Sequence, residues 1–388
     1  MKKIYLDNSA STPVEKKVFD DMLPYFSEKY GNASSLHFFG QEAQHALDGP
    51  RSKVAKFLNC ETEEVFFTGS ATEASNLAIA GLIRRARENT KAKPHIIISS
   101  IEHESILETV KYYTERGEIE STLIPVSSEG FVSCDELRSS LKDNTILVSV
   151  MHANNEIGTI QPIGKISQII RKFNKENARN VLFHTDSAQS ANFLDCDVKV
   201  LDVDMLTISG HKIYGPKGVG ILFVKKGVDL DPLITGSKQE SGIRSGTENI
   251  PAIVGIASAL EIVVEERKNL NKMIDLRDNL LDDILKNIKD VKLNGSLENR
   301  VHSNLNISFK GIDKEDLLLA LDLKGIAVSG GSACYSKSLK ESHVLNALAL
   351  SNEEKKSSIR ISLGRSSTSE DMNYLVSSLK EIVENLRS

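Results

Sequence analysis

Cysteine is scarce in this sequence, and long apolar runs are missing from it. Only four of the 388 residues are cysteines, and no two of them form the C-x-x-C pair that often binds a metal. Few, unclustered thiols are typical of a chain that keeps its cysteines reduced in the cytosol. No apolar run approaches the roughly 20 residues that cross a bilayer, and the first residues lack the apolar stretch of a signal peptide. The sequence predicts a soluble, cytoplasmic protein.

An excess of positive charge is also missing. The formal net charge is -5, so the chain offers no basic surface of the kind that binds nucleic acid. Hydrophobic residues make up 40% and charged residues 26%, which is ordinary for a globular protein. At about 150 residues per domain, this length favours two or three domains.

Strand-like and helix-like patterns alternate through the first two thirds of the chain. The alternation predicts an α/β fold with a mostly parallel, doubly wound sheet. A long helical pattern at about 250–270 follows, and the strand-like runs 304–309, 326–330 and 358–363 after it predict a smaller α+β domain. The strands predicted for the sheet are 65–68, 95–100, 122–126, 146–151, 181–186, 205–209 and 220–224.

In open α/β sheets, ligands bind at the carboxyl ends of the strands, so the polar residues there are candidate site residues. After the run 65–68, Ser70 and Glu73 have the spacing of a capping box before a helical pattern. Such a helix start offers backbone N–H groups to a phosphate. A capped helix without a ligand fits the same pattern.

Two further strand ends carry polar residues. His103 follows the run 95–100, and Asn154 and Asn155 follow the run 146–151. A histidine in a loop is more often a surface residue than a catalyst, so neither signal is strong alone.

An acid and a lysine at two successive strand ends are more informative. Asp186 ends the run 181–186, and Lys212 lies just past the run 205–209. A lysine there could form a Schiff base with a carbonyl cofactor, and a carboxylate could hold a protonated ring nitrogen. A salt bridge between strand ends is the alternative, but it does not explain the glycines near Lys212.

Those glycines do not form a nucleotide-binding loop. Gly215, Gly218 and Gly220 lack the G-x-G-x-x-G order, and Lys212 is not followed by the Ser or Thr of a P-loop.

The chain resembles the cysteine desulfurases of the NifS/IscS type, which are pyridoxal-phosphate enzymes of the class V aminotransferase family with the aspartate-aminotransferase fold. The matching blocks run from residue 5 to residue 365 in the order of that family. They are "YLDNSASTP", "GNASSLH", "SATEASNLAI", "EHES", "HANNEIGTIQPI", "HTDSAQS", "SGHKIYGPKGVG", "IRSGTEN", "SGGSAC" and "IRISLGR".

The resemblance implies two domains and a homodimer. Residues 15–258 would form the large pyridoxal-phosphate-binding domain with its seven-stranded sheet. Residues 1–14 together with 259–388 would form the small domain, which carries a mobile cysteine loop at about 329–343. The length of that loop places the chain with the long-loop group of the family.

The resemblance also implies roles around the cofactor ring. Lys212 would bind pyridoxal phosphate covalently, Asp186 would pair with the pyridine nitrogen, and Gln189 would bond the ring hydroxyl. His103 would stack on the ring as a catalytic residue, and Asn155 would lie near the ring hydroxyl and the substrate carboxylate.

The remaining implied roles concern the phosphate and the substrate. Arg360 would clamp the substrate carboxylate through a charge-assisted contact. Thr247 would reach the phosphate from the partner subunit. The residues that would cradle the phosphate within one chain are Ala71, Thr72, Ser209 and His211.

Cys334 is the candidate nucleophile among the four thiols. Cys60, Cys134 and Cys196 each have acidic neighbours in sequence, which would raise a thiol pKa if they are close in space. Cys334 has no acid within five residues, and Lys337 lies three positions on. Without the rest of the site, an inert loop thiol would be favoured. Beside a pyridoxal-phosphate site, Cys334 is predicted to attack the substrate sulfur, giving a persulfide and L-alanine.

The predicted function is that of a cysteine desulfurase that passes sulfur to an iron-sulfur scaffold or another acceptor protein. No metal is predicted in the catalytic site, although Cys334 could ligate a nascent iron-sulfur cluster. A selenocysteine lyase would use the same cofactor site. A non-catalytic sulfur-trafficking or regulatory module is a second alternative, but it would need neither Lys212 nor Cys334. Neither nucleic acid nor a membrane is a predicted partner.

The sequence departs from the family at two loops. Ser237, Lys238 and Ser241 stand where the family commonly has a triple glycine and an arginine, and Ser70 stands where glycine is common. We expect these changes to affect loop geometry and substrate fit rather than the type of reaction.

Overall fold

The computed structural model describes residues 2–89, 92–331 and 341–388. The predicted nucleophile Cys334 and most of the predicted cysteine loop lie outside the described residues. Within the described ranges, no helix combines the length and the apolar character needed to span a bilayer.

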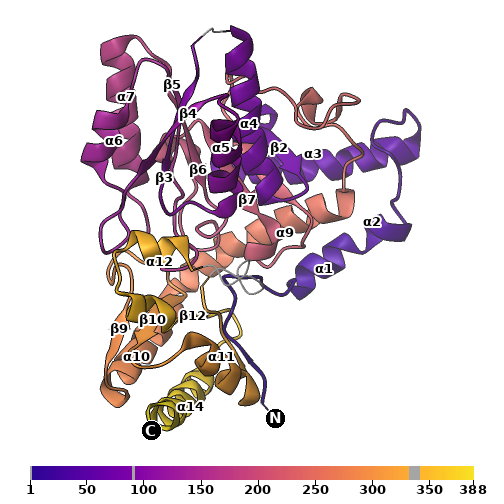
Figure 1. Ribbon diagram of the computed structural model, residues 1–388. Coiled ribbons are helices and arrows are strands. Elements are labelled where there is room, and N and C mark those ends of the chain that lie inside the picture. The colour runs from indigo at the N-terminus through magenta and orange to yellow at the C-terminus, as the bar shows by residue number, and fades with distance from the viewer. Residues whose placement is uncertain (1, 90–91, 332–340) are drawn as a thin grey trace.

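A seven-stranded sheet forms the larger part of the molecule (Figure 1). Its strand order is β2-β8-β7-β6-β5-β3-β4, and only β8 runs antiparallel to its neighbours. The prediction of a mostly parallel sheet is therefore confirmed. The strands are β2 (Val65–Thr68), β3 (His95–Ser99), β4 (Glu120–Ile124), β5 (Thr145–Ser149), β6 (Leu182–Asp186), β7 (Met205–Ser209) and β8 (Gly220–Val224).

Helices cover both faces of this sheet, as a doubly wound fold requires. Successive strand residues point to opposite faces, so Ile97 of β3 packs in one core cluster while Ile96 and Ile98 pack in another. The first cluster includes α1 (Lys16–Met22), α3 (Phe38–Leu58), α6 (Cys134–Ser140), α7 (Ile163–Asn177) and α9 (Ile250–Glu266). The second includes α4 (Ala71–Asn89) and α5 (Glu104–Glu115). The short helices are α2 (Pro24–Ser27) and α8 (Val198–Leu201).

A smaller α+β part lies below the large sheet in Figure 1. Its three-stranded antiparallel sheet has the order β12-β10-β9. The first strand of the chain, β1 (Ile4–Tyr5), pairs parallel with β11 (Ile326–Ala327) and contributes Ile4 to the core of this part. The other elements are α10 (Leu270–Asn287), β9 (Val291–Leu293), β10 (Asn304–Phe309), α11 (Lys314–Leu323), α12 (His343–Ala347), α13 (Asn352–Lys356), β12 (Ser358–Ser362) and α14 (Ser369–Arg387).

The loop that departs from the family pattern has an unusual backbone. Glu240 and Ser241 have φ values of 45° and 56°, followed by Gly242 at 83°. Left-handed backbone costs a residue with a Cβ roughly 1–2 kcal/mol. The Glu240 carboxyl accepts hydrogen bonds from the guanidinium of Arg51 at 2.7 and 3.0 Å and from the backbone N–H of Phe67 at 2.9 Å. These bonds hold the loop in its strained conformation.

Replacing Ser241 with glycine should stabilise the protein. The change removes the cost of the left-handed backbone but adds chain entropy to the unfolded state, which leaves a net gain of about 0.5–1 kcal/mol. The measurement is the thermal unfolding midpoint. Lys238→Gly in the same loop is the control, because Lys238 has φ -86° and gains nothing from glycine. A Ser241→Gly midpoint at or below that of Lys238→Gly would contradict the expected relief of strain.

Candidate active site

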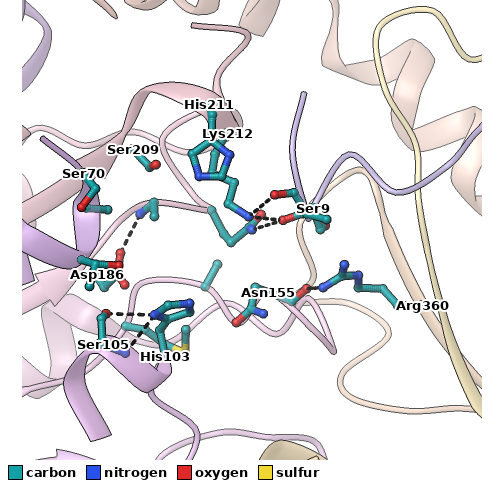
Figure 2. Close-up of a pocket in the computed structure, with 17 residues that line it drawn as sticks. Ser9, Ser70, His103, Ser105, Asn155, Asp186, Ser209, His211, Lys212 and Arg360 are labelled. Carbon is teal, nitrogen blue, oxygen red and sulfur yellow. Dashed lines mark hydrogen bonds between the residues drawn. The ribbon is translucent and has the colours of Figure 1, made fainter. Parts of the chain in front are cut away.

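A cavity of about 270 Å³ opens where the parallel strands of the large sheet end. Its lining comes from both parts of the molecule, since β12 of the smaller part contributes Arg360 (Figure 2). The predicted site residues that line it are Ala71, Thr72, His103, Asn155, Asp186, Gln189, Ser209, His211, Lys212 and Arg360.

The start of helix α4 forms one wall of this cavity. Ala71 and Thr72 occupy the first turn, where backbone N–H groups and the helix dipole favour an anion. The Ser70 hydroxyl accepts a hydrogen bond from the N–H of Glu73 at 3.1 Å, which is one half of the expected capping box. The Glu73 carboxyl does not complete the box. It accepts instead from the N–H of Gly69 at 2.8 Å and from Arg244 Nε at 2.8 Å.

The glycines near Lys212 have a packing cause that the sequence argument did not identify. A Cβ on Gly220 would lie 2.4 Å from the carbonyl carbon of Ser70, so glycine lets β8 approach the start of α4. A Cβ on Gly215 would lie 2.9 Å from the carbonyl oxygen of Gly210. These glycines therefore allow close packing of the chain around the cavity.

Lys212 lies at the end of a 3-10 turn (Gly210–Lys212) directly after β7. Its Nζ donates hydrogen bonds to the backbone carbonyls of Ser9 at 2.5 Å and Ala10 at 2.8 Å (Figure 2). Gln189 Nε2 donates to the same Ser9 carbonyl at 2.8 Å. The amino-terminal segment thus fixes the amine at the edge of the cavity.

Asp186 ends β6 and is buried. One of its carboxyl oxygens accepts from the N–H of Ala188 at 2.9 Å. Burial raises the pKa of Asp186, and the nearby His103 and Lys212 oppose that shift. A protonated ring nitrogen placed against this carboxyl would supply the counter-charge that burial makes valuable.

His103 caps the start of α5. Its Nδ1 accepts from the N–H of Ser105 at 3.1 Å and lies 2.9 Å from the Ser105 hydroxyl. Burial lowers the pKa of His103, the charge of Asp186 opposes this shift, and the charge of Lys212 adds to it. Because Nδ1 accepts the Ser105 N–H, the proton of a neutral imidazole would lie on Nε2.

Arg360 on β12 is 1% exposed, and two of its three guanidinium nitrogens have protein partners. Nη2 lies 2.7 Å from Oδ1 of Asp7, and Nη1 donates to the backbone carbonyl of Asn155 at 3.0 Å. Its buried Nε has no hydrogen-bond partner among the described residues. Buried donors are normally satisfied, so a ligand carboxylate at this wall would complete the site.

Thr247 is not brought into this cavity. It lines a neighbouring cavity together with Gly69 and Arg244. Its predicted action across a dimer remains a prediction.

The three described cysteines all lie outside the lining of the active-site cavity. Burial raises the pKa of Cys60 to about 12 and that of Cys196 to about 11, and Glu64 and Glu61 add to the effect at Cys60. Thiols with such raised pKa values are poor nucleophiles near neutral pH. Residues 2–89, 92–331 and 341–388 contain no group of three or more His, Cys, Asp or Glu side chains arranged to hold a metal ion.

Residues 4–375 match the sequence model of the family described as aminotransferase class-V. The chain belongs to this family.

Relatives of this chain match it over more than nine tenths of their length. It is 44% identical over 388 residues to the cysteine desulfurase IscS of Dictyoglomus turgidum, covering 100% of this chain and 96% of that protein. It is 46% identical over 388 residues to the IscS of Methanosarcina thermophila, covering 100% and 93%. A solved structure of a NifS-like protein superimposes with a TM-score of 0.91 at 38% identity, covering 99% of this chain and 100% of that one. The predicted aspartate-aminotransferase-like fold is therefore confirmed.

Enzymes of this family use pyridoxal phosphate, and the described residues of the cavity fit that cofactor. Lys212 supplies an amine for its aldehyde, Asp186 supplies a buried carboxyl for its ring nitrogen, and the start of α4 supplies N–H groups for its phosphate. When bound, pyridoxal phosphate draws electrons away from the Cα of an amino acid.

Several residues in or beside the cavity lining have no role in the sequence-based prediction. Ser9 and Ala10 act through backbone carbonyls, and Asp7 acts through its contact with Arg360. All three belong to the block "YLDNSASTP", which carries the resemblance but gives no local sign of these contacts. Sequence reasoning also missed four other lining residues, Ser105, Met151, Ala153 and Ala188.

Lys212→Ala should lose the visible absorption of a lysine-bound pyridoxal phosphate. We expect this loss because Lys212 is the only lysine among the described residues that line the cavity. The measurement is the absorption spectrum of the purified protein. Lys217→Ala is the control, since Lys217 is exposed in the same loop. A normal spectrum for Lys212→Ala would place the cofactor elsewhere.

Proposed function

We propose that this chain is a pyridoxal-phosphate-dependent cysteine desulfurase, which converts L-cysteine to L-alanine and transfers the sulfur to Cys334 as a persulfide. One observation carries the proposal. A single cavity combines a lysine amine, a buried carboxyl and a buried arginine in a chain that matches cysteine desulfurases end to end. Iron-sulfur cluster assembly and other thiolation reactions are the processes that would consume this sulfur.

The described side chains divide the work of this reaction. Arg360 binds the substrate carboxylate, with Asn155 beside it. The Lys212 amine removes and returns the proton at the substrate Cα, while Asp186 keeps the ring nitrogen protonated. His103 lines the same cavity, where it would lie against the cofactor ring and could hold a proton at Nε2.

Cys334 is the proposed sulfur acceptor. The other three cysteines lie outside the cavity lining, and burial raises the pKa of two of them. Cys334 follows Gly331 by three residues, and Gly331 is joined to the Arg360 strand through Ser329.

The domain division that we propose is residues 15–258 for the large domain and residues 1–14 with 259–388 for the small one. Separate hydrophobic cores support two parts, and the core of the large one continues past residue 258 to Val263 of α9. The cores of the large sheet draw on residues 18–263, whereas the core around β10 and β12 draws on Ile4, Leu6 and residues 280–383.

A homodimer in the cytoplasm is the proposed form of the enzyme. Large apolar side chains are exposed between residues 19 and 38, and a second copy would cover them. Residues 33–34 of this region line a surface cavity together with residues 237–241 and Glu248, next to Thr247. The three described cysteines form no disulfide, which fits a reducing compartment. The exposed side chains are Phe19, Leu23, Phe26, Tyr30, Leu36 and Phe38.

Cys334→Ser should abolish persulfide formation. Mass spectrometry of the protein after incubation with L-cysteine should find one added sulfur atom on the wild-type peptide that contains Cys334. Cys60→Ser should carry this sulfur normally, because the raised pKa of Cys60 leaves it unreactive. Sustained alanine production by Cys334→Ser would rule out Cys334 as the nucleophile.

Arg360→Lys should weaken substrate binding. A lysine cannot reproduce the planar fork that contacts Asp7, Asn155 and a carboxylate together, so KM for L-cysteine should rise about 10-fold or more. Steady-state kinetics measures the change. Arg365→Lys is the control from the same sequence block, since Arg365 lies outside the cavity lining. An unchanged KM for Arg360→Lys would place the carboxylate elsewhere.

A further inference from the structure

Glu156 is buried beside the active site, and the proposed reaction gives it no role. It is 1% exposed and follows Asn155, which lines the cavity. Its Oε2 accepts a hydrogen bond from the Ser342 hydroxyl at 2.6 Å. A Cβ placed on Gly331 would lie 2.9 Å from the same oxygen. Ser342 therefore bonds this carboxyl oxygen and Gly331 lies next to it, and these two residues flank the segment that carries Cys334.

The backbone of Glu156 is held on both sides. Its N–H donates to Oδ1 of Asn154 at 2.8 Å. Its carbonyl accepts from Nδ2 of Asn304 at 3.1 Å and of Asn306 at 3.3 Å, both on β10 of the smaller sheet. The carboxyl therefore projects from a fixed point between the two parts of the molecule.

The Ser342 end of the segment is also fixed. Ser342 caps α12, and its hydroxyl accepts from the N–H of Leu345 at 3.1 Å while it donates to Glu156. Val344 and Leu345 of α12 pack on residues beside the cavity in a small apolar cluster that includes Met151. The hydroxyl is thus held in one orientation.

The Gly331 end leads directly to Arg360. Gly331 has φ 121°, which favours glycine, and its carbonyl accepts from the Ser329 hydroxyl at 2.9 Å. The backbones of Ser329 and Arg360 exchange two hydrogen bonds, of 3.1 and 2.6 Å. The Gly331 end is therefore joined through Ser329 to the strand that carries Arg360.

The position of Gly331 matters for Cys334 because the two residues are close in sequence. Cys334 follows Gly331 by three residues, so a Gly331 held in place is a fixed point close in sequence to the thiol.

We propose that Glu156 is a positioning residue, whose carboxyl holds both ends of the Cys334 segment together beside the cavity. This inference rests on the proposed role of Cys334. Glu156 is not among the described residues that line the cavity. It acts by keeping the thiol within reach of the substrate sulfur.

The test compares Glu156→Ala with Glu156→Gln, whose amide oxygen can still accept from Ser342. In a single turnover with L-cysteine, Glu156→Ala should slow persulfide formation about 10- to 100-fold, the range expected for a misplaced reacting group. Cofactor absorption and the dissociation constant for L-cysteine should stay near wild type in both variants. Glu156→Gln should recover most of the rate. Glu298→Ala, an exposed acid outside this contact, is the matched control.

Hydrogen exchange gives a readout that does not depend on turnover. In Glu156→Ala, peptides covering 326–331 and 342–350 should exchange faster, while peptides from β5, β6 and β7 should not change. Ser342→Ala removes the donor of the same bond and should reproduce both effects in part. If Glu156→Ala does not fold, Ser342→Ala decides the question alone.

The outcomes separate the two proposals. A wild-type rate in Glu156→Ala or in folded Ser342→Ala, with no persulfide in Cys334→Ser, overturns the anchor and leaves the proposed function standing. Loss of L-cysteine binding and cofactor absorption in parallel with the rate overturns it too, because a general structural role would then explain the effect. Persulfide formation in Cys334→Ser overturns the proposed function itself.

Discussion

The contact between Arg360 and Asp7 joins the parts of the structure on which the site depends. Arg360 comes from the smaller sheet, Asp7 from the amino-terminal segment, and the Asn155 carbonyl from a loop of the large sheet. A buried guanidinium needs partners, since leaving it unpaired is strongly destabilising. The charge therefore fixes three separate segments around one cavity. Lys212 is tied into the same arrangement, because its amine bonds the Ser9 and Ala10 carbonyls two and three residues after Asp7.

The sheet could be predicted because its signals are local. Strands β2, β7 and β8 have the predicted bounds, since a fully buried strand appears as a short apolar run. Strand β4 was predicted at 122–126 but lies at Glu120–Ile124. It is the edge strand next to β3, with exposed residues that weaken the apolar pattern, and the predicted range included Pro125, which cannot donate to a ladder.

The part of the site that lies at the strand ends was predictable from the sheet topology. Asp186 ends a strand, His103 and Lys212 each follow one, and parallel strands bring their ends to one edge. The contacts of Asp7, Ser9 and Ala10 were not predictable, because they depend on tertiary packing between residues far apart in sequence and partly on backbone carbonyls. Glu73 shows the same limit at short range. Its spacing fits a capping box with Ser70, yet its carboxyl turns to Gly69 and Arg244. Thr247 and Cys334 remain predictions.

The pairing of β1 with β11 has a consequence for the order of assembly during synthesis. Residues 4–10 leave the ribosome long before Ile326, Ala327 and Arg360. The large sheet can form while the amino-terminal segment still lacks its partner strand. The carbonyls that hold the Lys212 amine are therefore fixed in place only after residues 326–360 have been synthesised, so a nascent chain carries the lysine before it has the surroundings that orient it.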